Sequence, residues 1–128
     1  LFTTLHTIGV AETIRRAVMM FDASERQGVA VDIMESMRMI VTQILLDRVG
    51  GGKVGCREYM VFDDVARERF LDASPDEWPR VARKLIDSGE VTGRSMSESA
   101  RELRDAGHIS ERQYEYIAAR SKRVEEAV

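Results

Sequence analysis

The sequence predicts an α/β fold with few strands and mostly helices. Residues 53–62 alternate apolar and polar side chains, which is the period of a β-strand. Residues 1–5 form a second short apolar run, which leads through His6 and Thr7 directly into a helical pattern. Most of the remaining chain shows helical spacing or helix-capping residues. With 44% hydrophobic and 32% charged residues in a chain of 128, the composition is that of a folded globular protein.

Charge and cysteine content exclude several classes of protein. A net charge of -3 argues against a dedicated nucleic-acid binder, which needs a surplus of Lys and Arg to contact phosphates. Cys56 is the single cysteine, so no internal disulfide can form, and a reducing compartment is expected. In its strand, Cys56 is expected to be a core residue rather than a nucleophile. No Cys/His cluster indicates a metal site, and no apolar run reaches the length of a membrane span.

Two long helices are predicted in the first 48 residues. Residues 10–20 place Val10, Ile14 and Val18 on one side of a helix. Residues 25–48 repeat apolar side chains at helical spacing, so the sequence predicts a second helix there, ended by the three glycines at 50–52. A strand over residues 53–62 follows.

The rest of the chain reads as helices that are separated by turns. A short helix is predicted over residues 63–72, and Ser74 with Pro75 begins another that runs to Ile86 and stops at Gly89. The last two helices are marked by cap pairs and by a turn at Gly107; the cap pairs are Ser95 with Glu98 and Ser110 with Gln113. Residues 91–93 are expected to form a loop, so residues 73–128 should be all-helical.

Residues 1–21 resemble the histidine box of the secretion ATPases, the hexameric motors of type II secretion, type IV pilus retraction and type IV secretion. The matching positions in this region are His6, Thr7, Thr13, Arg16, Met20 and Phe21. The similarity continues at Ser36, Met37, Arg38, Gln43, Leu45, Leu46 and Glu58. Ile44 departs from the pilus motors, which commonly carry Arg there. Residues 59–64 and the helices after them look closest to Dot/Icm-type (type IVB) secretion and conjugal-transfer ATPases.

The resemblance implies a fold and an activity for the intact protein. Residues 1–72 would be the C-terminal portion of a RecA-like ATPase domain, and residues 73–128 a helical C-terminal subdomain. The intact protein would be a cytoplasmic hexamer, peripheral to the inner membrane, that binds secretion-apparatus proteins there and hydrolyses ATP with Mg²⁺ for type IV secretion or conjugal transfer.

The printed sequence lacks the phosphate loop that such an ATPase needs. No G-x-x-x-x-G-K-[ST] pattern occurs, and residues 50–53 lack its spacing and its hydroxyl. In the family, the phosphate loop and the Walker B acid lie before the histidine box. The chain is therefore expected to be the C-terminal half of a motor, inactive and without bound ATP or Mg²⁺ by itself. We also expect the strand at residues 1–5, without sheet neighbours, to pair with another copy, to swap elements or to be partly ordered.

Four residues are the candidates for the site. By resemblance, His6 is the catalytic-site histidine near the γ-phosphate, and Thr7, Arg16 and Arg38 serve nucleotide sensing or the subunit interface. Without the resemblance, His6 would be a histidine that hydrogen-bonds backbone at a strand end. The arginines, with Arg15, would be a solvated helix face paired with acids such as Glu12. No metal ligand is predicted. Glu58 is expected to be structural rather than a general base.

Two other functions remain open for the last helices. Residues 95–123 have the order helix, glycine turn, helix, which resembles a helix-turn-helix DNA reader. Residues 95–124 carry six basic and five acidic side chains, a balance that disfavours phosphate contacts. A non-enzymatic helical interaction module is the other alternative.

Overall fold

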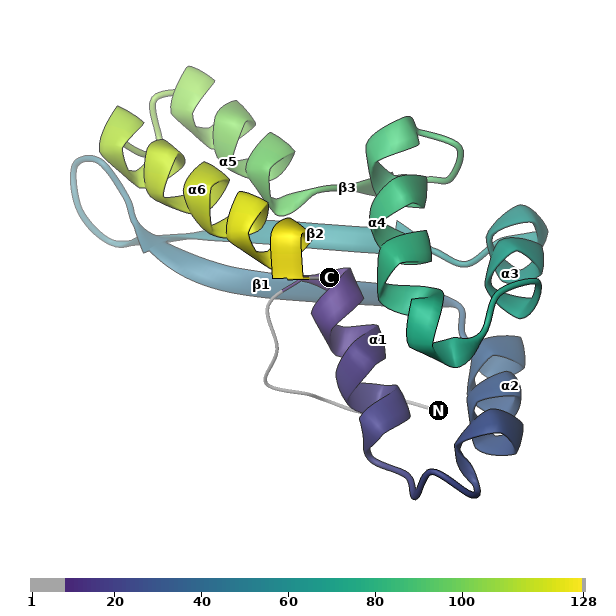
Figure 1. Cartoon of the computed structure of the whole chain (residues 1–128). Coiled ribbons are helices and arrows are strands. Elements are labelled where there is room, and N and C mark those ends of the chain that lie inside the picture. Colours follow the sequence, from purple (N-terminus) through teal and green to yellow (C-terminus); the bar gives the residue numbers. More distant parts are fainter. Residues whose placement is uncertain (1–8, 128) are drawn as a thin grey trace.

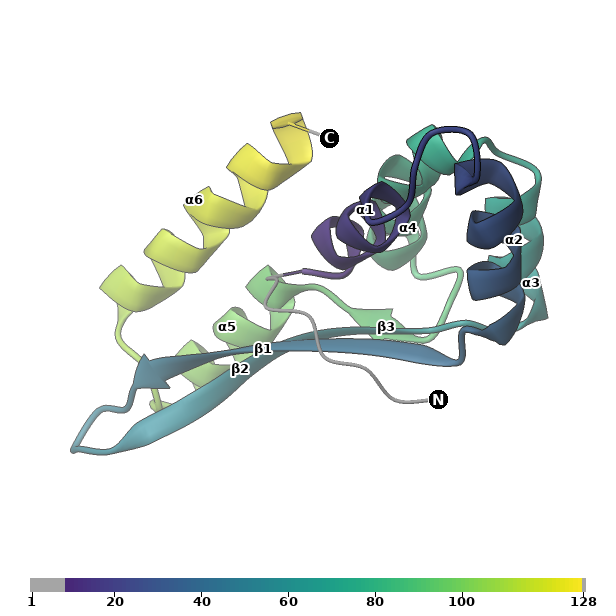
Figure 2. The ribbon, with the colours of Figure 1, turned by 90° about the horizontal axis from the view of Figure 1, so that it is seen from below.

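A computed structural model of the chain describes the backbone of residues 9–127 and side chains from Gly9 to Lys122. Among these residues, strands β1 (Met39–Asp47), β2 (Lys53–Val61) and β3 (Gly93–Arg94) form an antiparallel sheet in the order β1-β2-β3. Figure 1 shows the long β1–β2 hairpin. Figure 2 shows four helices on one side of the sheet: α1 (Val10–Met19), α4 (Trp78–Ser88), α5 (Met96–Asp105) and α6 (Glu111–Ala127). The strand predicted at residues 1–5 lies outside the described residues.

The first helix is confirmed, and the second is much shorter than predicted. Helix α1 spans Val10–Met19 and buries Val10, Ile14 and Val18. Helix α2 spans only Arg26–Ser36, because the backbone becomes extended at Met37. Residues 39–47 form strand β1 (Met39–Asp47) instead of a helix. The prediction of a helix over residues 25–48 is therefore wrong in its second half.

Strand pairing explains why residues 39–47 are extended. Every residue of β1 faces a residue of β2 (Lys53–Val61), from Met39 opposite Val61 to Asp47 opposite Lys53. Ile40, Val41, Thr42 and Ile44 are β-branched, which suits a pleated sheet better than a helix. The glycines at 50–52, predicted to end a helix, instead turn the hairpin, and all three have positive φ values of 81° to 115°. The strand predicted at 53–62 is confirmed.

A short third strand joins the sheet from a segment that was predicted to be a loop. Strand β3 (Gly93–Arg94) pairs with Tyr59 and Met60 of β2. A Cβ atom at Gly93 would lie 2.8 Å from the Tyr59 carbonyl oxygen, so only glycine permits this approach. The part of the chain after residue 72 is thus not purely helical, because it contributes this strand to the sheet.

The helices after the sheet begin and end near the predicted residues. Helix α3 spans Asp64–Leu71, a 3₁₀ turn η1 spans Pro75–Glu77, and α4 spans Trp78–Ser88. The helix predicted from Ser74 therefore has a tight 3₁₀ first turn, and its α-helical part starts at Trp78. Gly89 ends α4 with φ 75°, as predicted. The buried Trp78 donates its indole N–H to the Phe70 carbonyl oxygen at 2.6 Å, which ties α4 to α3.

The last two helices form a hairpin that packs on the half of the sheet nearest the β1–β2 turn. Helix α5 spans Met96–Asp105 and α6 spans Glu111–Ala127. Both predicted caps are present, since Ser95 accepts from Glu98 N–H and Ser110 accepts from Gln113 N–H, each at 3.2 Å. Gly107 has φ 80° in the turn between the helices.

The hydrophobic core has two clusters that share the sheet. The larger cluster joins α1, α2, α3 and α4 to one half of the sheet and contains Val10, Ala11, Ile14, Val18, Ala30, Met34, Ile40, Met60, Phe62, Ala66, Phe70, Trp78, Ala82, Leu85, Ile86 and Val91. The smaller one joins α5 and α6 to the other half and contains Cys56, Met96, Ala100, Ile109 and Ile117. The larger cluster draws on both sides of residue 72, and the domain division there stays a prediction.

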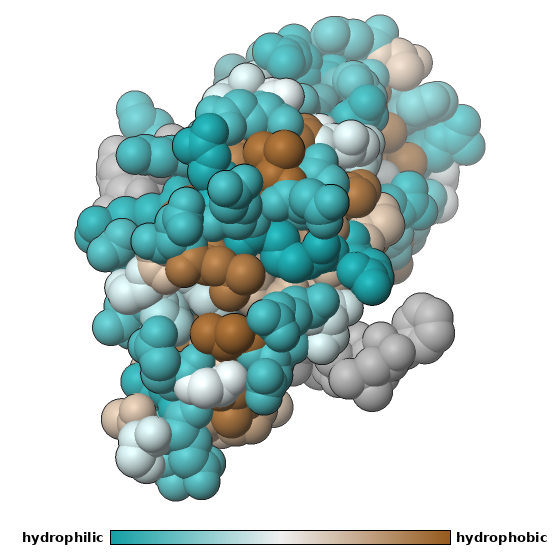
Figure 3. Space-filling view, turned by 90° about the vertical axis from the view of Figure 1, so that its right-hand side faces the viewer, coloured by the Kyte–Doolittle hydropathy of each residue, from teal (hydrophilic) through white to brown (hydrophobic). Residues whose placement is uncertain are grey.

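The described surface is mixed in character. On the face that carries α2 and α3, hydrophobic side chains form separate patches among hydrophilic ones (Figure 3). Val65 and Leu71 of α3 are among the exposed hydrophobic residues. Within residues 9–127, no helix is both long enough and apolar enough to cross a membrane.

Candidate functional site

The buried carboxylate of Glu58 lies where two helices begin. Glu58 points inward from β2 and is only 2% exposed. Its Oε2 accepts the N–H of Val10, the first residue of α1, at 2.5 Å. Its Oε1 accepts the N–H of Met96, the first residue of α5, at 3.0 Å. The first N–H groups of a helix have no partner within the helix and carry partial positive charge, so a carboxylate is well suited to bind them.

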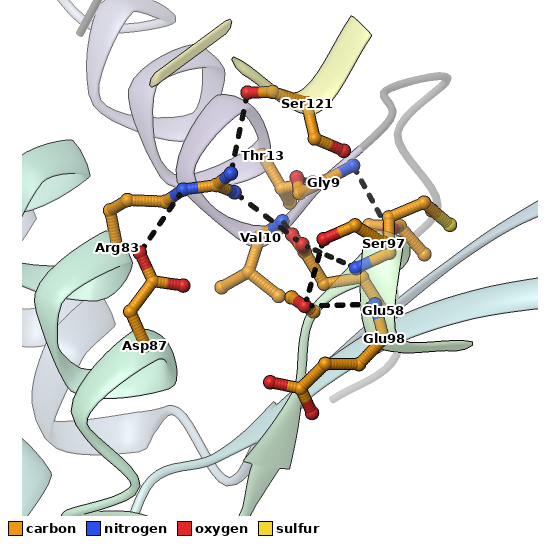
Figure 4. Close-up of polar contacts among 12 residues, drawn as sticks. Gly9, Val10, Thr13, Glu58, Arg83, Asp87, Ser97, Glu98 and Ser121 are labelled. Carbon is orange, nitrogen blue, oxygen red and sulfur yellow. Dashed lines mark hydrogen bonds and ion pairs between the residues drawn. The ribbon is translucent and has the colours of Figure 1, made fainter. Parts of the chain in front are cut away.

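Arg83 of α4 supplies a full positive charge beside this carboxylate. Its Nη1 lies 3.7 Å from Glu58 Oε1, and its side chain is 14% exposed. Its Nε lies 3.7 Å from Asp87 on the next turn of α4, and its Nη2 donates to the Ser121 carbonyl oxygen of α6 at 3.3 Å. Figure 4 shows Arg83 between these three partners. The charge of Glu58 is therefore balanced from α4, and α6 joins the same network.

Gly9 is held closely against the same carboxylate. Its N–H donates to Thr42 Oγ1 of β1 at 3.0 Å, and its carbonyl oxygen accepts from Thr13 Oγ1 at 2.9 Å. Its φ of 94° is in the region that favours glycine. A Cβ atom at this position would lie 3.1 Å from Glu58 Oε2. The entrance to α1 is thus fixed by both long strands.

A small hollow lies beside the network. Its volume is about 30 Å³, and it is lined by Gly9, Ala11, Glu12, Ile44, Glu58, Arg83, Met96, Ile117, Arg120 and Ser121. That volume is on the scale of a water molecule and far too small for a nucleotide. The network is therefore an internal link between elements and not a nucleotide pocket.

Two of the four predicted site residues, His6 and Thr7, lie outside the described residues. The other two come from different elements. Arg16 is on α1 with a side chain 59% exposed, 3.9 Å from Glu12. Arg38 is exposed between α2 and β1, where its carbonyl oxygen accepts from Phe62 N–H at 2.9 Å. Glu12 also binds Arg15 at 2.7 Å, and this interaction raises the pKa of the Arg15 guanidinium.

Sequence reasoning missed Gly9, Thr42 and Arg83 as parts of one network. One signal was available, because Glu58 takes an inward position in the alternation of β2, between Cys56 and Met60. An acid on the apolar face of a strand requires hydrogen-bond or charge partners. The partners themselves are distant in sequence, so their identity needed the fold.

Cys56 is buried in the smaller cluster, as predicted for a core residue. Its thiol donates to the Met96 carbonyl oxygen at 3.5 Å. Burial raises the pKa of this thiol, so it stays protonated at neutral pH and is a poor nucleophile. Among the described residues, no group of three His, Cys, Asp or Glu side chains could hold a metal ion.

The fold is that of the C-terminal part of a secretion or pilus motor ATPase domain. The chain is similar to the X-ray structure of the Legionella pneumophila ATPase DotB, with a TM-score of 0.84 and 42% identity over 91% of this chain and 31% of that one. The Yersinia pseudotuberculosis ATPase DotB superposes with a TM-score of 0.73 and 27% identity over 85% of this chain and 28% of that one. No family model matches the chain.

Sequence comparison supports the same class. The type IV pilus retraction ATPase PilT of Pseudomonas aeruginosa is 40% identical over 60 residues, which are 47% of this chain and 17% of PilT. The chain thus spans less than a third of each of these relatives. These findings confirm the resemblance to secretion and pilus motor ATPases that residues 1–64 indicated.

Proposed function

We propose that this chain is the C-terminal part of a hexameric ATPase that powers type IV secretion or conjugal transfer. The observation that carries the proposal is the similarity to the Legionella ATPase DotB, at 42% identity over 91% of the chain. The intact protein would hydrolyse ATP with Mg²⁺ in the cytoplasm, against the inner membrane, in contact with proteins of the secretion apparatus. The chain alone would be inactive, since its sequence holds no phosphate loop.

Within that motor, the chain would supply the histidine box and subunit-interface residues. His6 would act near the γ-phosphate as a hydrogen-bond donor that senses the nucleotide, with Thr7 beside it in the sequence. Arg16 and Arg38 have exposed side chains, which suits contact with a neighbouring subunit or its nucleotide. We further propose that residues 1–72 complete the ATPase domain and that residues 73–128 form the C-terminal subdomain.

The helix-turn-helix alternative has little support from the α5–α6 hairpin. Arg104 lies 3.2 Å from Asp105 and 3.4 Å from Glu111, and its guanidinium stacks on Tyr114 at 4.1 Å. A side chain that is paired with two acids is poorly placed to contact phosphates. We therefore prefer the interpretation of this part of the chain as part of an ATPase.

The test is steady-state hydrolysis of Mg²⁺-ATP by the complete gene product, with His6→Ala compared with His108→Ala. His108 is a matched control, because its structural bonds in the α5–α6 turn are made by its backbone N–H and carbonyl oxygen. We expect kcat to fall about 100-fold in His6→Ala, the scale of losing one preorganised donor. We expect His108→Ala to stay within about twofold. Equal activity of the two variants, or no hydrolysis by the unmodified protein, would contradict the proposal.

A further inference from the structure

We propose that Glu58 is a positioning residue that couples the α5–α6 hairpin to the start of α1, which in the sequence follows the proposed site residues His6 and Thr7. The inference deepens the proposed function and rests on it. The role of Glu58 would be to hold the start of α1 in register with the C-terminal helices.

The two oxygens of the carboxylate serve two different helices. Oε2 binds the Val10 N–H at 2.5 Å, and Oε1 binds the Met96 N–H at 3.0 Å. Val10 and Met96 are themselves buried, at 0% and 4% exposed. Water therefore cannot readily replace either bond, and an unpaired N–H in such a place is unfavourable. Because the carboxylate is rigid and planar, movement of one helix start strains the bond to the other.

Arg83 extends the coupling to the C-terminal helix. It holds Glu58 Oε1 from α4 and the Ser121 carbonyl oxygen from α6. A displacement of α6 would therefore reach the carboxylate by two routes, through Arg83 and through α5. Charge and geometry act together, since a neutral side chain at position 58 would lose the attraction to the guanidinium.

Gly9 is closely held where the network meets the start of α1. Its N–H is fixed by Thr42, and its Cα lies so close to Glu58 that an added Cβ would be 3.1 Å from Oε2. The residues that follow Gly9 form α1, and those that precede it include His6 and Thr7. The position of the carboxylate therefore sets where the chain enters α1.

The experiment compares Glu58→Gln with Cys56→Ala in the complete gene product. Cys56 is the neighbouring inward residue of β2, and it contacts the Met96 carbonyl oxygen but neither of the two helix-start N–H groups. Two quantities are measured: amide hydrogen exchange at the starts of α1 and α5, and kcat and KM for ATP.

The coupling predicts a distinct pattern for Glu58→Gln. Exchange should rise about tenfold or more at both helix starts, and kcat should fall with KM within about twofold, since the phosphate loop lies elsewhere. Cys56→Ala should leave exchange at Val10 and kcat unchanged. Faster exchange at only one helix start, or an unchanged kcat with faster exchange at both, would overturn the proposal.

A second variant covers the case in which Glu58→Gln fails to fold. Gly9→Ala keeps the carboxylate and pushes on Oε2 from the α1 side. Coupling predicts faster exchange at Met96 as well, although Met96 is on another helix, whereas a local effect would stop at α1. If His6→Ala leaves hydrolysis unchanged, the proposed function fails, and the exchange pattern still decides whether the two helices are coupled.

Discussion

At the scale of single residues, the inward position of Glu58 was predictable from the sequence, but the partners of its carboxylate were not. The alternation of β2 puts Glu58 on the same face as Cys56 and Met60, and the structure confirms that face as buried. The sequence alone could not show that Val10, Met96 and Arg83 meet there, because they come from three other elements. Their meeting depends on how the helices pack over the sheet, which no local pattern encodes.

Gly9 gives the residue-scale prediction. We expect Gly9→Ala to lower the free energy of unfolding by about 1–3 kcal/mol, because alanine is strained at φ 94° and its Cβ would crowd Glu58. Gly28→Ala is the matched control. Gly28 lies inside α2 with no atom near an added Cβ, so the same change should stabilise by about 0.5–1 kcal/mol. Urea unfolding of both variants measures the difference, and a shift of the same sign in both would contradict the account.

At the scale of elements, the main wrong prediction concerns β1, whose residues were predicted to be part of a helix. Residues 37–46 are mostly apolar, and a short apolar run fits a buried helix as well as a strand. The extended backbone at Met37 and the nine-residue pairing with β2 decide the outcome, and both are tertiary effects. The helices with clear caps, at Ser95 and Ser110, were predictable because a cap is a local interaction.

Neighbouring residues of β1 supply the element-scale prediction. Ile40 is 7% exposed and Val41 is 51% exposed, as expected for alternate faces of a strand. We expect Ile40→Ala to lower the free energy of unfolding by about 2–4 kcal/mol, since it leaves a cavity in the larger cluster. Val41→Ala should cost less than about 1 kcal/mol. Denaturant unfolding checks both values. Equal losses at the two positions would argue that the segment does not alternate as a strand.

At the scale of the whole molecule, two hydrophobic clusters share one sheet, and the Glu58 network lies at their junction. The larger cluster contains Val10 and the smaller one Met96, whose N–H groups Glu58 binds. The class of protein was predictable from the sequence because the resemblance to a histidine box, at His6, Thr7, Arg16 and neighbouring positions, is a local pattern. Whether these residues meet at one site was not predictable, because this chain spans only 31% of the similar Legionella DotB structure.

Native mass spectrometry of the complete gene product, with and without Mg²⁺-ATP, tests the central claim most directly. The account predicts a species of six copies that carries nucleotide, with each copy heavier than the 14.5 kDa of this chain. Subunit assembly and nucleotide binding are then read from the same mass. A single copy that binds no nucleotide at any ATP concentration would contradict the claim that this chain is part of a motor ATPase.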